Sequence, residues 1–297
     1  MGTVPSRPAA KWLCAALQSD IRKIDPLLAT LTVPPRFNGP PAGGNGGYSC
    51  GLLSAHLEGP VVVSLRRPVP LDEPLEIRAE DGGSGRAFAD GELVAEALAA
   101  APPAPWDGPP VSLAEARAAR ERHASPSGGE FDRCFVCGRS RPDGFGVFTG
   151  PVSPIDRSSR SHSATHVRAK RELTAGRSQL AADGAEKCER GAGVVASPWT
   201  PPDWAADEDG EVAAEFVWAA LDCPAYFALH GEGLEVAYLV RQQVEILAPP
   251  RAGVEYVVVG MPLERSGRKG LAATAILDVG GEVLAHAECL FVVPRDS

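Results

Sequence analysis

The sequence predicts an α+β protein that contains two copies of one unit, each with a helix followed by an antiparallel meander of strands. The first observation is an internal similarity: ADGELVAEALA (89–99) matches VGGEVLAHAECL (279–290), with the shared residues 190 positions apart. The second is that LRRPVPL (65–71) resembles VRQQVEI (240–246) at a spacing of 175. Because the two matches occur in the same order along the chain, they indicate a duplicated unit.

Each predicted unit begins with a Gly- or Pro-rich approach that leads into an apolar helix. In the first unit, FNGPPAGGNGG (37–47) precedes YSCGLLSAHLEG (48–59). In the second unit, SPWTPPDW (197–204) precedes EFVWAALDCPAYFALHG (215–231). Segments rich in Val, Ile and Leu then predict the strands. They are VVVSLRRPV, LEIRAED and ELVAEALA in the first unit, and EVAYLVRQQVEIL, VEYVVVGMPLE, LAATAILDV and EVLAHAECLFVV in the second.

Shifts in composition mark the domain boundaries. APPAPWDGPP (101–110) is a Pro-rich linker, and SLAEARAARERHA (112–124) predicts a short charged helix that starts at Ser. Residues 153–192 are rich in Ser, Arg and Ala with almost no large apolar side chains, which predicts a disordered insertion. FGVF (145–148) is expected to be the first strand of the second unit. The predicted domains are an N-terminal extension (1–32), a first unit (33–100), a linker with a short helix (101–133), and a second unit (134–152 and 193–297) around the insertion (153–192).

Charge and cysteine content narrow the function classes. The chain has 297 residues and a net charge of −9, which argues against the basic surface that nucleic acids and anionic membranes require. No apolar run approaches the roughly 18 residues of a membrane span, and the N-terminus lacks the continuous apolar core of a signal peptide. Seven cysteines, an odd number spread unevenly, are typical of free thiols in a reducing compartment. We therefore expect a cytoplasmic protein with no nucleic-acid or membrane partner.

Asp222 is unusual because it lies in an otherwise apolar stretch, EFVWAALDCPAYFAL (215–229). A buried carboxylate costs several kcal/mol unless it is paired, hydrogen-bonded or protonated. One interpretation is a helix N-cap, because Pro224 fits the first turn of a helix that restarts at Cys223. The other interpretation is catalysis, in which the carboxylate activates water or attacks an acyl group directly.

Gly46 and Gly47 could supply the hydrogen-bond donors that a catalytic carboxylate needs beside it. Glycines at a helix N-terminus let a carbonyl group approach the free amides at the positive end of the helix dipole, and Asn45 fits the N-cap position. The second unit has AAEFV instead of a Gly-Gly pair, whereas the first unit has a neutral residue, near Ser54, where the second has Asp222. The sequence therefore predicts one composite site that combines Gly47 with Asp222. A flexible turn is the alternative interpretation of the two glycines.

Three segments resemble the double-hotdog acyl-CoA thioesterases of the thioesterase II type. NGGYSCGLLSAHL (45–57) resembles the Gly-Gly entry into that family's first central helix, and WAALDCPAYFALH (218–230) resembles the second-half segment in which an Asp precedes a polar-aromatic stretch. GGEVLAHAECLFVVPR (280–295) resembles the last strand. The resemblance implies a tandem (double) hotdog fold, with antiparallel sheets each wrapped around a central helix, that assembles into a homodimer. It also implies hydrolysis of acyl-CoA or a related acyl thioester in lipid metabolism, with no metal or organic cofactor.

Two features of that family have no match here. Its members use a Gln on the last strand to help hold the attacking water, and the nearest register places Cys289 there, beside Glu288. The Thr or Ser that partners the family's Asp has no assigned counterpart. These departures keep a second function open, an acyl-thioester-binding hotdog protein without turnover. A hotdog hydratase or dehydratase ranks third, because the Asp–His pairing it needs does not follow the first helix.

The remaining candidates complete the predicted site. Gln242 and Gln243 lie on an alternating strand, so one should point inward, either to orient a water molecule or to bond a neighbouring strand. Four cations are candidates for binding the phosphates of coenzyme A or for plain exposed charge: Arg66, Arg67, Arg268 and Lys269. The catalytic prediction is Asp222, Gly47 and Gly46, and the substrate-binding prediction is Asn45, Tyr48, Gln242 and Gln243.

Cys134 and Cys137, in RCFVCGRS, are the only metal candidates. Joined to His162 and His166 they would give C-x₂-C-x₂₄-H-x₃-H, a gap too long for a standard zinc finger. We therefore predict no metal, and we interpret the cysteine pair as a tight turn at the start of the second unit.

Overall fold

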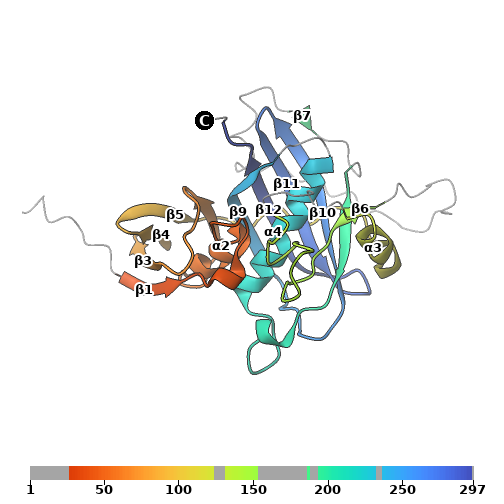
Figure 1. Ribbon diagram of the computed structural model, residues 1–297, viewed down its shortest axis with the longest axis horizontal. Helices are drawn as coiled ribbons and strands as arrows, with labels where there is room; N and C mark the ends of the chain where they lie inside the picture. The colour runs from red at the N-terminus through yellow and green to blue at the C-terminus, as the bar shows by residue number, and fades with distance from the viewer. Residues whose placement is uncertain (1–26, 124–130, 153–185, 188–192, 232–235, 296–297) are drawn as a thin grey trace, which may run out of the picture.

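The computed structural model describes residues 27–123, 131–152, 186–187, 193–231 and 236–295, which form one antiparallel sheet with helices against it (Figure 1). The sheet has 12 strands, and eleven of them follow the order β1-β3-β4-β5-β2-β9-β12-β11-β10-β8-β6, while β7 pairs with β10. The elements of the first half are β1 (Leu27–Thr32), the 3-10 helix η1 (Pro35–Phe37), α2 (Gly46–Ser54), β2 (Val61–Leu65), β3 (Pro74–Glu80), β4 (Ser84–Ala89) and β5 (Glu92–Ala99).

The second half has longer strands and a longer helix. Its elements are α3 (Leu113–Arg120), β6 (Gly150–Pro151), β7 (Glu186–Lys187), β8 (Val195–Trp199), the 3-10 helix η4 (Asp203–Ala205), α4 (Ala214–Gly231), β9 (Tyr238–Ile246), β10 (Tyr256–Ser266), β11 (Lys269–Leu277) and β12 (Val283–Val292). α3 begins as predicted, because Ser112 caps it in a capping box with Glu115.

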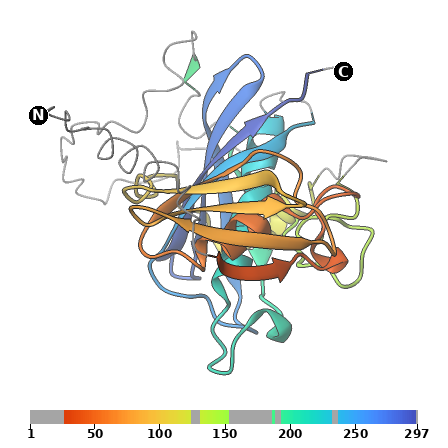
Figure 2. The ribbon, with the colours of Figure 1, turned by 90° about the vertical axis from the view of Figure 1, so that its left-hand side faces the viewer.

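The two halves meet where β2 pairs with β9, and the strand order is the same on both sides of this junction. Outward from it, one half reads β2-β5-β4-β3-β1 and the other reads β9-β12-β11-β10-β8. The junction itself is short, with Val62, Val63 and Ser64 opposite Gln243, Gln242 and Arg241. One internal match of the sequence falls on equivalent strands, since 89–99 and 279–290 include β5 and most of β12. In the other match, 240–246 lies in β9, whereas 65–71 begins at the last residue of β2 and continues into the loop that follows. Figure 2 shows the strands of the first half from the outside.

α2 and α4 contact each other and the sheet, with α2 against strands of the first half and β9, and α4 against β8 to β12. Two glycines of α2 permit this close crossing. A Cβ at Gly47 would lie 2.6 Å from the carbonyl oxygen of Trp218, and a Cβ at Gly51 would lie 2.5 Å from the Cα of Glu215. The packing of the two helices therefore requires glycine at both positions.

Several predicted elements differ from the structure. β1 lies before the predicted start of the first unit at residue 33, and β4 lies between two predicted strands, where the sequence predicted no strand. FGVF (145–148) is not a strand of the sheet; the amides of Phe145 and Val147 donate to the carbonyl oxygens of Phe135 and Val136 in the preceding loop instead. Apart from β7, the predicted insertion at 153–192, with His162 and His166, lies outside the described residues, as do residues 1–26 of the N-terminal extension.

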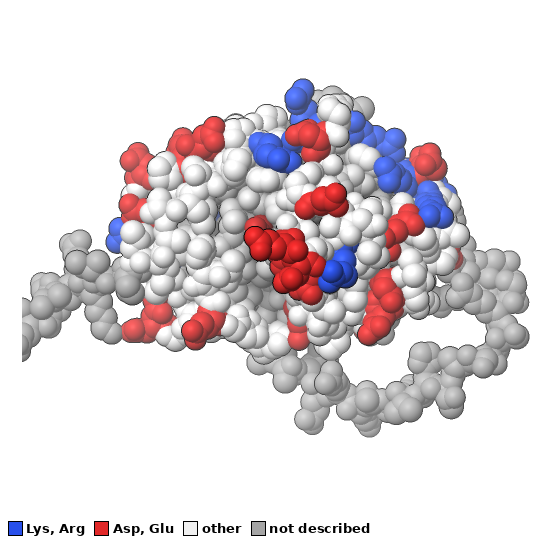
Figure 3. All heavy atoms as spheres, turned by 90° about the horizontal axis from the view of Figure 1, so that it is seen from below, with Lys and Arg blue, Asp and Glu red and all other residues white. Residues whose placement is uncertain are grey.

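Charged side chains are unevenly distributed over the surface. On the face shown in Figure 3, acidic groups gather near the middle and basic groups lie mainly toward one edge, with broad uncharged areas between them. No helix in the described part of the chain is long and apolar enough to cross a membrane.

Candidate functional site

Asp222 lies in the middle of α4, is 5% exposed, and touches the N-terminus of α2. Its Oδ2 accepts hydrogen bonds from the Gly47 amide at 2.9 Å and from Asn45 Nδ2 at 3.0 Å. The structure thus brings together a carboxylate of the second half and a helix N-terminus of the first half. Both bonds end on Oδ2, and neither of them occupies Oδ1.

Asn45 has two tasks at this junction. Its Oδ1 accepts from the Tyr48 amide at 2.9 Å, which makes it the N-cap of α2, as predicted. Because the cap occupies the oxygen, the amide nitrogen points away from α2 toward Asp222, and it also approaches Cys134 Sγ at 3.9 Å. The cap therefore fixes the orientation of a donor to the acid.

Burial dominates the acidity of Asp222. It raises the pKa of the carboxyl from 3.8 to about 7, because the charged form loses its hydration. The hydrogen bond from Gly47 opposes this effect, the neighbouring Cys134 adds to it, and the bond from Asn45 opposes it. A carboxyl that titrates near neutral pH suits a general base.

A cavity of about 630 Å³ opens beside Asp222. Asn45, Gly46 and Asp222 line it, and most of the remaining wall is apolar, including Leu239 and Phe291. Arg66 and Arg67 also line it, each paired with an acid on β5, Glu96 and Glu92 respectively. The cavity therefore combines an apolar interior, a carboxyl group and two cations.

Side chains from the sheet hold the turn of α4 that carries Asp222. Gln242 Nε2 donates to the carbonyl oxygen of Trp218 at 3.0 Å, and Thr274 Oγ1 donates to that of Leu221 at 2.9 Å. Cys289 Sγ donates to the same Leu221 oxygen at 3.6 Å. Sequence reasoning missed Thr274; its only signal is a polar residue in the apolar strand segment LAATAIL.

The other predicted binding residues have different positions. Gln242 is fully buried and bonds α4, as just described, whereas Gln243 donates to the carbonyl oxygen of Ala101. Tyr48 is buried among the rings of Phe37, Phe135 and Phe216. These three side chains support the architecture around the site, and the structure does not bring them to the carboxyl group.

α4 does not restart at Cys223. It runs without interruption from Ala214 to Gly231 with Pro224 inside it, so the N-cap interpretation of Asp222 is wrong. Proline inside a helix removes one hydrogen bond, and the bonds that Thr274 and Cys289 make to the neighbouring Leu221 carbonyl support this part of the helix.

Three buried thiols next to Asp222 are the residues that could hold a metal. The Sγ atoms of Cys134, Cys137 and Cys223 all lie within 4.8 Å of one another. Cys223 is the member that sequence reasoning missed, since it is 89 residues from Cys134. Its position directly after Asp222 places the thiols and the acid in the same cavity wall.

Comparison with solved structures identifies the fold. The chain is similar to a candidate thioesterase from Novosphingobium aromaticivorans, with a TM-score of 0.53, 14% identity, and coverage of 93% of this chain and 98% of that one. The two chains share a fold. The predicted resemblance to thioesterases is thus confirmed at the level of the fold, and the long antiparallel sheet with few helices fits a hotdog fold.

Two further solved structures have lower TM-scores. A tesB protein of Mycobacterium avium subspecies paratuberculosis has a TM-score of 0.49, 13% identity, and coverage of 95% and 99% of the two chains. A candidate thioesterase II of Thermobifida fusca has a TM-score of 0.49, 15% identity, and coverage of 90% and 92%. No protein-family model matches the sequence, and no curated protein matches it.

Proposed function

We propose that this chain is a double hotdog that hydrolyses acyl-CoA or a related acyl thioester, and that it works as a homodimer. The single observation that carries the activity is the contact between Asp222 and the N-terminus of α2, in the wall of a mainly apolar cavity. The identical strand order on the two sides of the β2–β9 junction supports the duplication.

In the proposed mechanism Asp222 is the general base. Its ionised form takes a proton from water, and the resulting hydroxide attacks the thioester carbon while the electron pair of the C=O bond moves to oxygen. The tetrahedral intermediate then expels the thiolate, which takes up a proton. The Gly47 and Asn45 bonds to Oδ2 hold the carboxyl group in place and favour its charged form.

The developing negative oxygen needs a donor that Asp222 does not already occupy. Gly46 is the first residue of α2 and lines the cavity, and its amide has no acceptor among the described residues. This amide lies at the positive end of the helix dipole. We therefore assign the oxyanion to Gly46, with Gly47 as the donor that positions the acid.

The cavity walls suggest the orientation of the substrate. The apolar part, with Leu239 and Phe291, suits an acyl chain, and the guanidinium groups of Arg66 and Arg67 suit phosphate groups. Both arginines are about half exposed, so their contribution to binding is expected to fall with added salt.

A thiol-release assay tests the proposal. Wild type and Asp222→Asn are compared on acyl-CoAs of several chain lengths, and binding of a non-hydrolysable CoA thioether is measured for both. Hydrolysis by the wild type and its loss in the variant, with thioether binding retained, are expected. Equal rates for the two proteins would remove Asp222 from the mechanism.

A non-catalytic acyl-thioester-binding protein is the second candidate. The observation that favours it is that the Gly47 amide is already bonded to Asp222, while Cys289, where the family resemblance expects Gln, donates to a helix carbonyl. Thioether binding by both proteins without hydrolysis of any acyl-CoA would establish this candidate in place of the hydrolase.

A further inference from the structure

Cys134, Cys137 and Cys223 have the spacing of a metal-thiolate centre. Cys134 Sγ and Cys223 Sγ are 3.8 Å apart, and all three sulfur atoms lie within 4.8 Å of one another. Tetrahedral zinc with Zn–S bonds of about 2.3 Å places its sulfur ligands about 3.8 Å apart. A disulfide would instead need an S–S distance of about 2.05 Å, which the sulfur atoms do not approach.

The loop that carries the first two cysteines has the conformation of a metal-binding knuckle. The chain reads Cys134-Phe-Val-Cys137-Gly138, and the Gly138 amide donates to the Cys134 carbonyl at 2.8 Å. A Cβ at Gly138 would lie 2.5 Å from the carbonyl oxygen of Asp132, so the turn requires glycine. The backbone amides of Cys137 and Val136 also donate to the Cys134 sulfur. Amides that point at a sulfur atom stabilise a thiolate, which is the form that binds metal.

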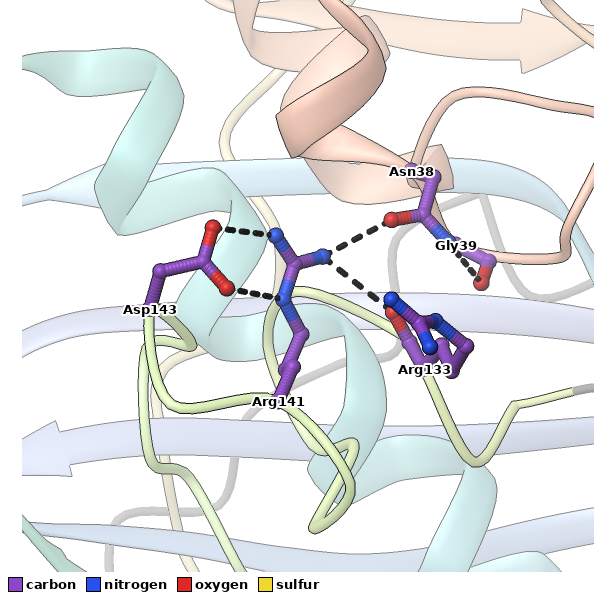
Figure 4. Close-up of polar contacts among 5 residues, drawn as sticks. All are labelled: Asn38, Gly39, Arg133, Arg141 and Asp143. Carbon is purple, nitrogen blue, oxygen red and sulfur yellow. Dashed lines mark hydrogen bonds and ion pairs between the residues drawn. The ribbon is translucent and has the colours of Figure 1, made fainter.

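Hydrogen bonds outside the cysteine cluster also hold this knuckle in place. The Arg141 guanidinium, 8% exposed, pairs with Asp143 and donates to Asn38 Oδ1 at 2.7 Å and to the Arg133 carbonyl at 3.1 Å (Figure 4). The Phe135 amide donates to the Asn38 carbonyl at 2.9 Å, which ties the knuckle to the first half of the chain. The ligands are therefore pre-organised, and binding would cost little ordering of the chain.

The thiols differ in acidity. Hydrogen bonds from the Cys137 and Cys223 thiols, with the two backbone amides, hold the pKa of Cys134 well below its usual range. The bond to Cys134, together with burial, raises the pKa of Cys223. The three thiols are thus buried and hydrogen-bonded to one another, and a divalent cation would offset most of the charge of three thiolates.

We propose that Cys134, Cys137 and Cys223 bind one Zn²⁺ ion, with a fourth coordination position that faces the cavity. Thiolates prefer soft or borderline cations, and zinc favours a tetrahedral set of sulfur ligands. Binding releases the thiol protons to the solvent. All three cysteines line the cavity together with Asp222, so a water molecule from the cavity completes the tetrahedron.

The open position distinguishes this centre from a purely structural one. Structural zinc sites usually have four protein ligands, whereas sites with three protein ligands and a water molecule accept a ligand from solution. Asn45 links the two parts of the cavity wall, because its Nδ2 donates to Asp222 Oδ2 and approaches Cys134 Sγ. The zinc site does not depend on the proposed hydrolysis and would remain if that proposal failed.

Zinc content measured by mass spectrometry tests the proposal. The full chain is purified in a phosphine reductant without chelators, and about one zinc per chain is expected. Cys134→Ala, Cys137→Ala and Cys223→Ala should each lose most of the metal. Cys289→Ala is the matched control, because Cys289 is also buried beside α4 but lies outside the three-cysteine cluster and donates to the Leu221 carbonyl; it should retain the metal.

Cobalt substitution keeps the test decisive if an alanine variant folds poorly. Wild-type protein stripped of metal and titrated with Co²⁺ should develop sulfur-to-cobalt charge-transfer absorption and the visible bands of tetrahedral cobalt, and Zn²⁺ should abolish both. The conservative Cys223→Ser variant, with its fold checked by circular dichroism, should give a weaker charge-transfer band. Less than a tenth of a zinc ion per chain, together with no cobalt–thiolate band, would overturn the proposal. Equal zinc content in wild type and the three alanine variants would also overturn it. So would a disulfide within the cluster in the freshly purified protein.

Discussion

The two halves of the sheet have the same strand order outward from the β2–β9 junction, but their helices differ in length and in chemistry. α2 has nine residues, three of them glycine, and presents an N-terminus capped by Asn45. α4 has 18 residues and places Asp222 in its ninth position, where α2 ends with Ser54. The Ser54 hydroxyl donates to a carbonyl of its own helix, that of Gly51, at 2.8 Å.

This difference shows that the two halves contribute different groups to the candidate site. The first half supplies amides and room, because Gly47 and Gly51 let α4 approach. The second half supplies the acid and the sheet side chains that hold it. Two halves on one chain are free to differ in sequence, so each needs to keep only its own part of the site.

The largest expected effect on activity comes from removing the acid of α4, and it is compared with the matched change in α2. Asp222→Asn should lower kcat/KM for acyl-CoA by about 10²- to 10⁴-fold, the usual contribution of a general base. Ser54→Ala is the matched change at the equivalent helix position and should leave kcat/KM within about twofold. Steady-state thiol release measures both. A similar loss in the two variants would mean that the halves contribute equally.

Gly47→Ala should break the contact between the helices. The new Cβ would lie 2.6 Å from the Trp218 carbonyl oxygen and 2.7 Å from the Cβ of Asp222, so one helix must move, at a cost of roughly 3 kcal/mol. Gly43→Ala is the control, because its Cβ would meet only ordinary contacts at 3.5 Å and beyond. Urea unfolding compares the two variants, and an unchanged midpoint for Gly47→Ala would contradict the crossing.

The buried acid should make stability depend on pH. The folded-state pKa of Asp222 is about 7, raised from 3.8, so between these values the folded protein binds a proton that the unfolded chain has lost. Stability therefore falls as the pH rises toward 7 and stays lower above it. Relative to wild type, Asp222→Asn should gain about 2 kcal/mol between pH 5 and pH 8. Thermal unfolding of both proteins at the two pH values measures this gain; a constant difference in Tm would mean that the acid does not titrate near neutrality.

The smallest expected effect concerns the sheet support of α4. Thr274→Val removes the hydroxyl that donates to Leu221 at 2.9 Å while keeping the shape of the side chain, which should cost about 1 kcal/mol. Thr274→Ser retains the hydroxyl and should keep the bond. Chemical denaturation compares the two, and if they lose stability equally, packing of the methyl group matters and the hydrogen bond does not.

The sequence was informative where a signal is local. The Asn45 cap follows from residue type and position, and the four main strands after α4 follow from their apolar runs between Gly- and Pro-containing turns. The contact between Asp222 and Gly47 was predicted by comparing the two halves, since each lacks what the other has. Strand β4, SGRAFA, was missed because its first two residues belong to a Gly-Gly-Ser-Gly stretch, which is typical of a turn.

The parts that sequence reasoning could not supply are the non-local ones. Cys223 joins Cys134 across 89 positions, and no spacing rule connects them. The uninterrupted course of α4 through Pro224 depends on tertiary contacts, including the Thr274 bond to Leu221. The choice between Gln242 and Gln243 required the strand register, because a shift of one residue reverses which side chain faces the core.

The contact between Asp222 and the N-terminus of α2 has a consequence for the number of ligands that one chain binds. Within the described part of the chain, Asp222 of the second half contacts the N-terminus of α2, and no acid of the first half makes the equivalent contact with α4, although the strand order is the same in both halves. Calorimetric titration with a tight thioether inhibitor should therefore saturate at one equivalent per polypeptide. If the proposed hydrolysis is correct, covalent modification of Asp222 alone should abolish the activity of the chain.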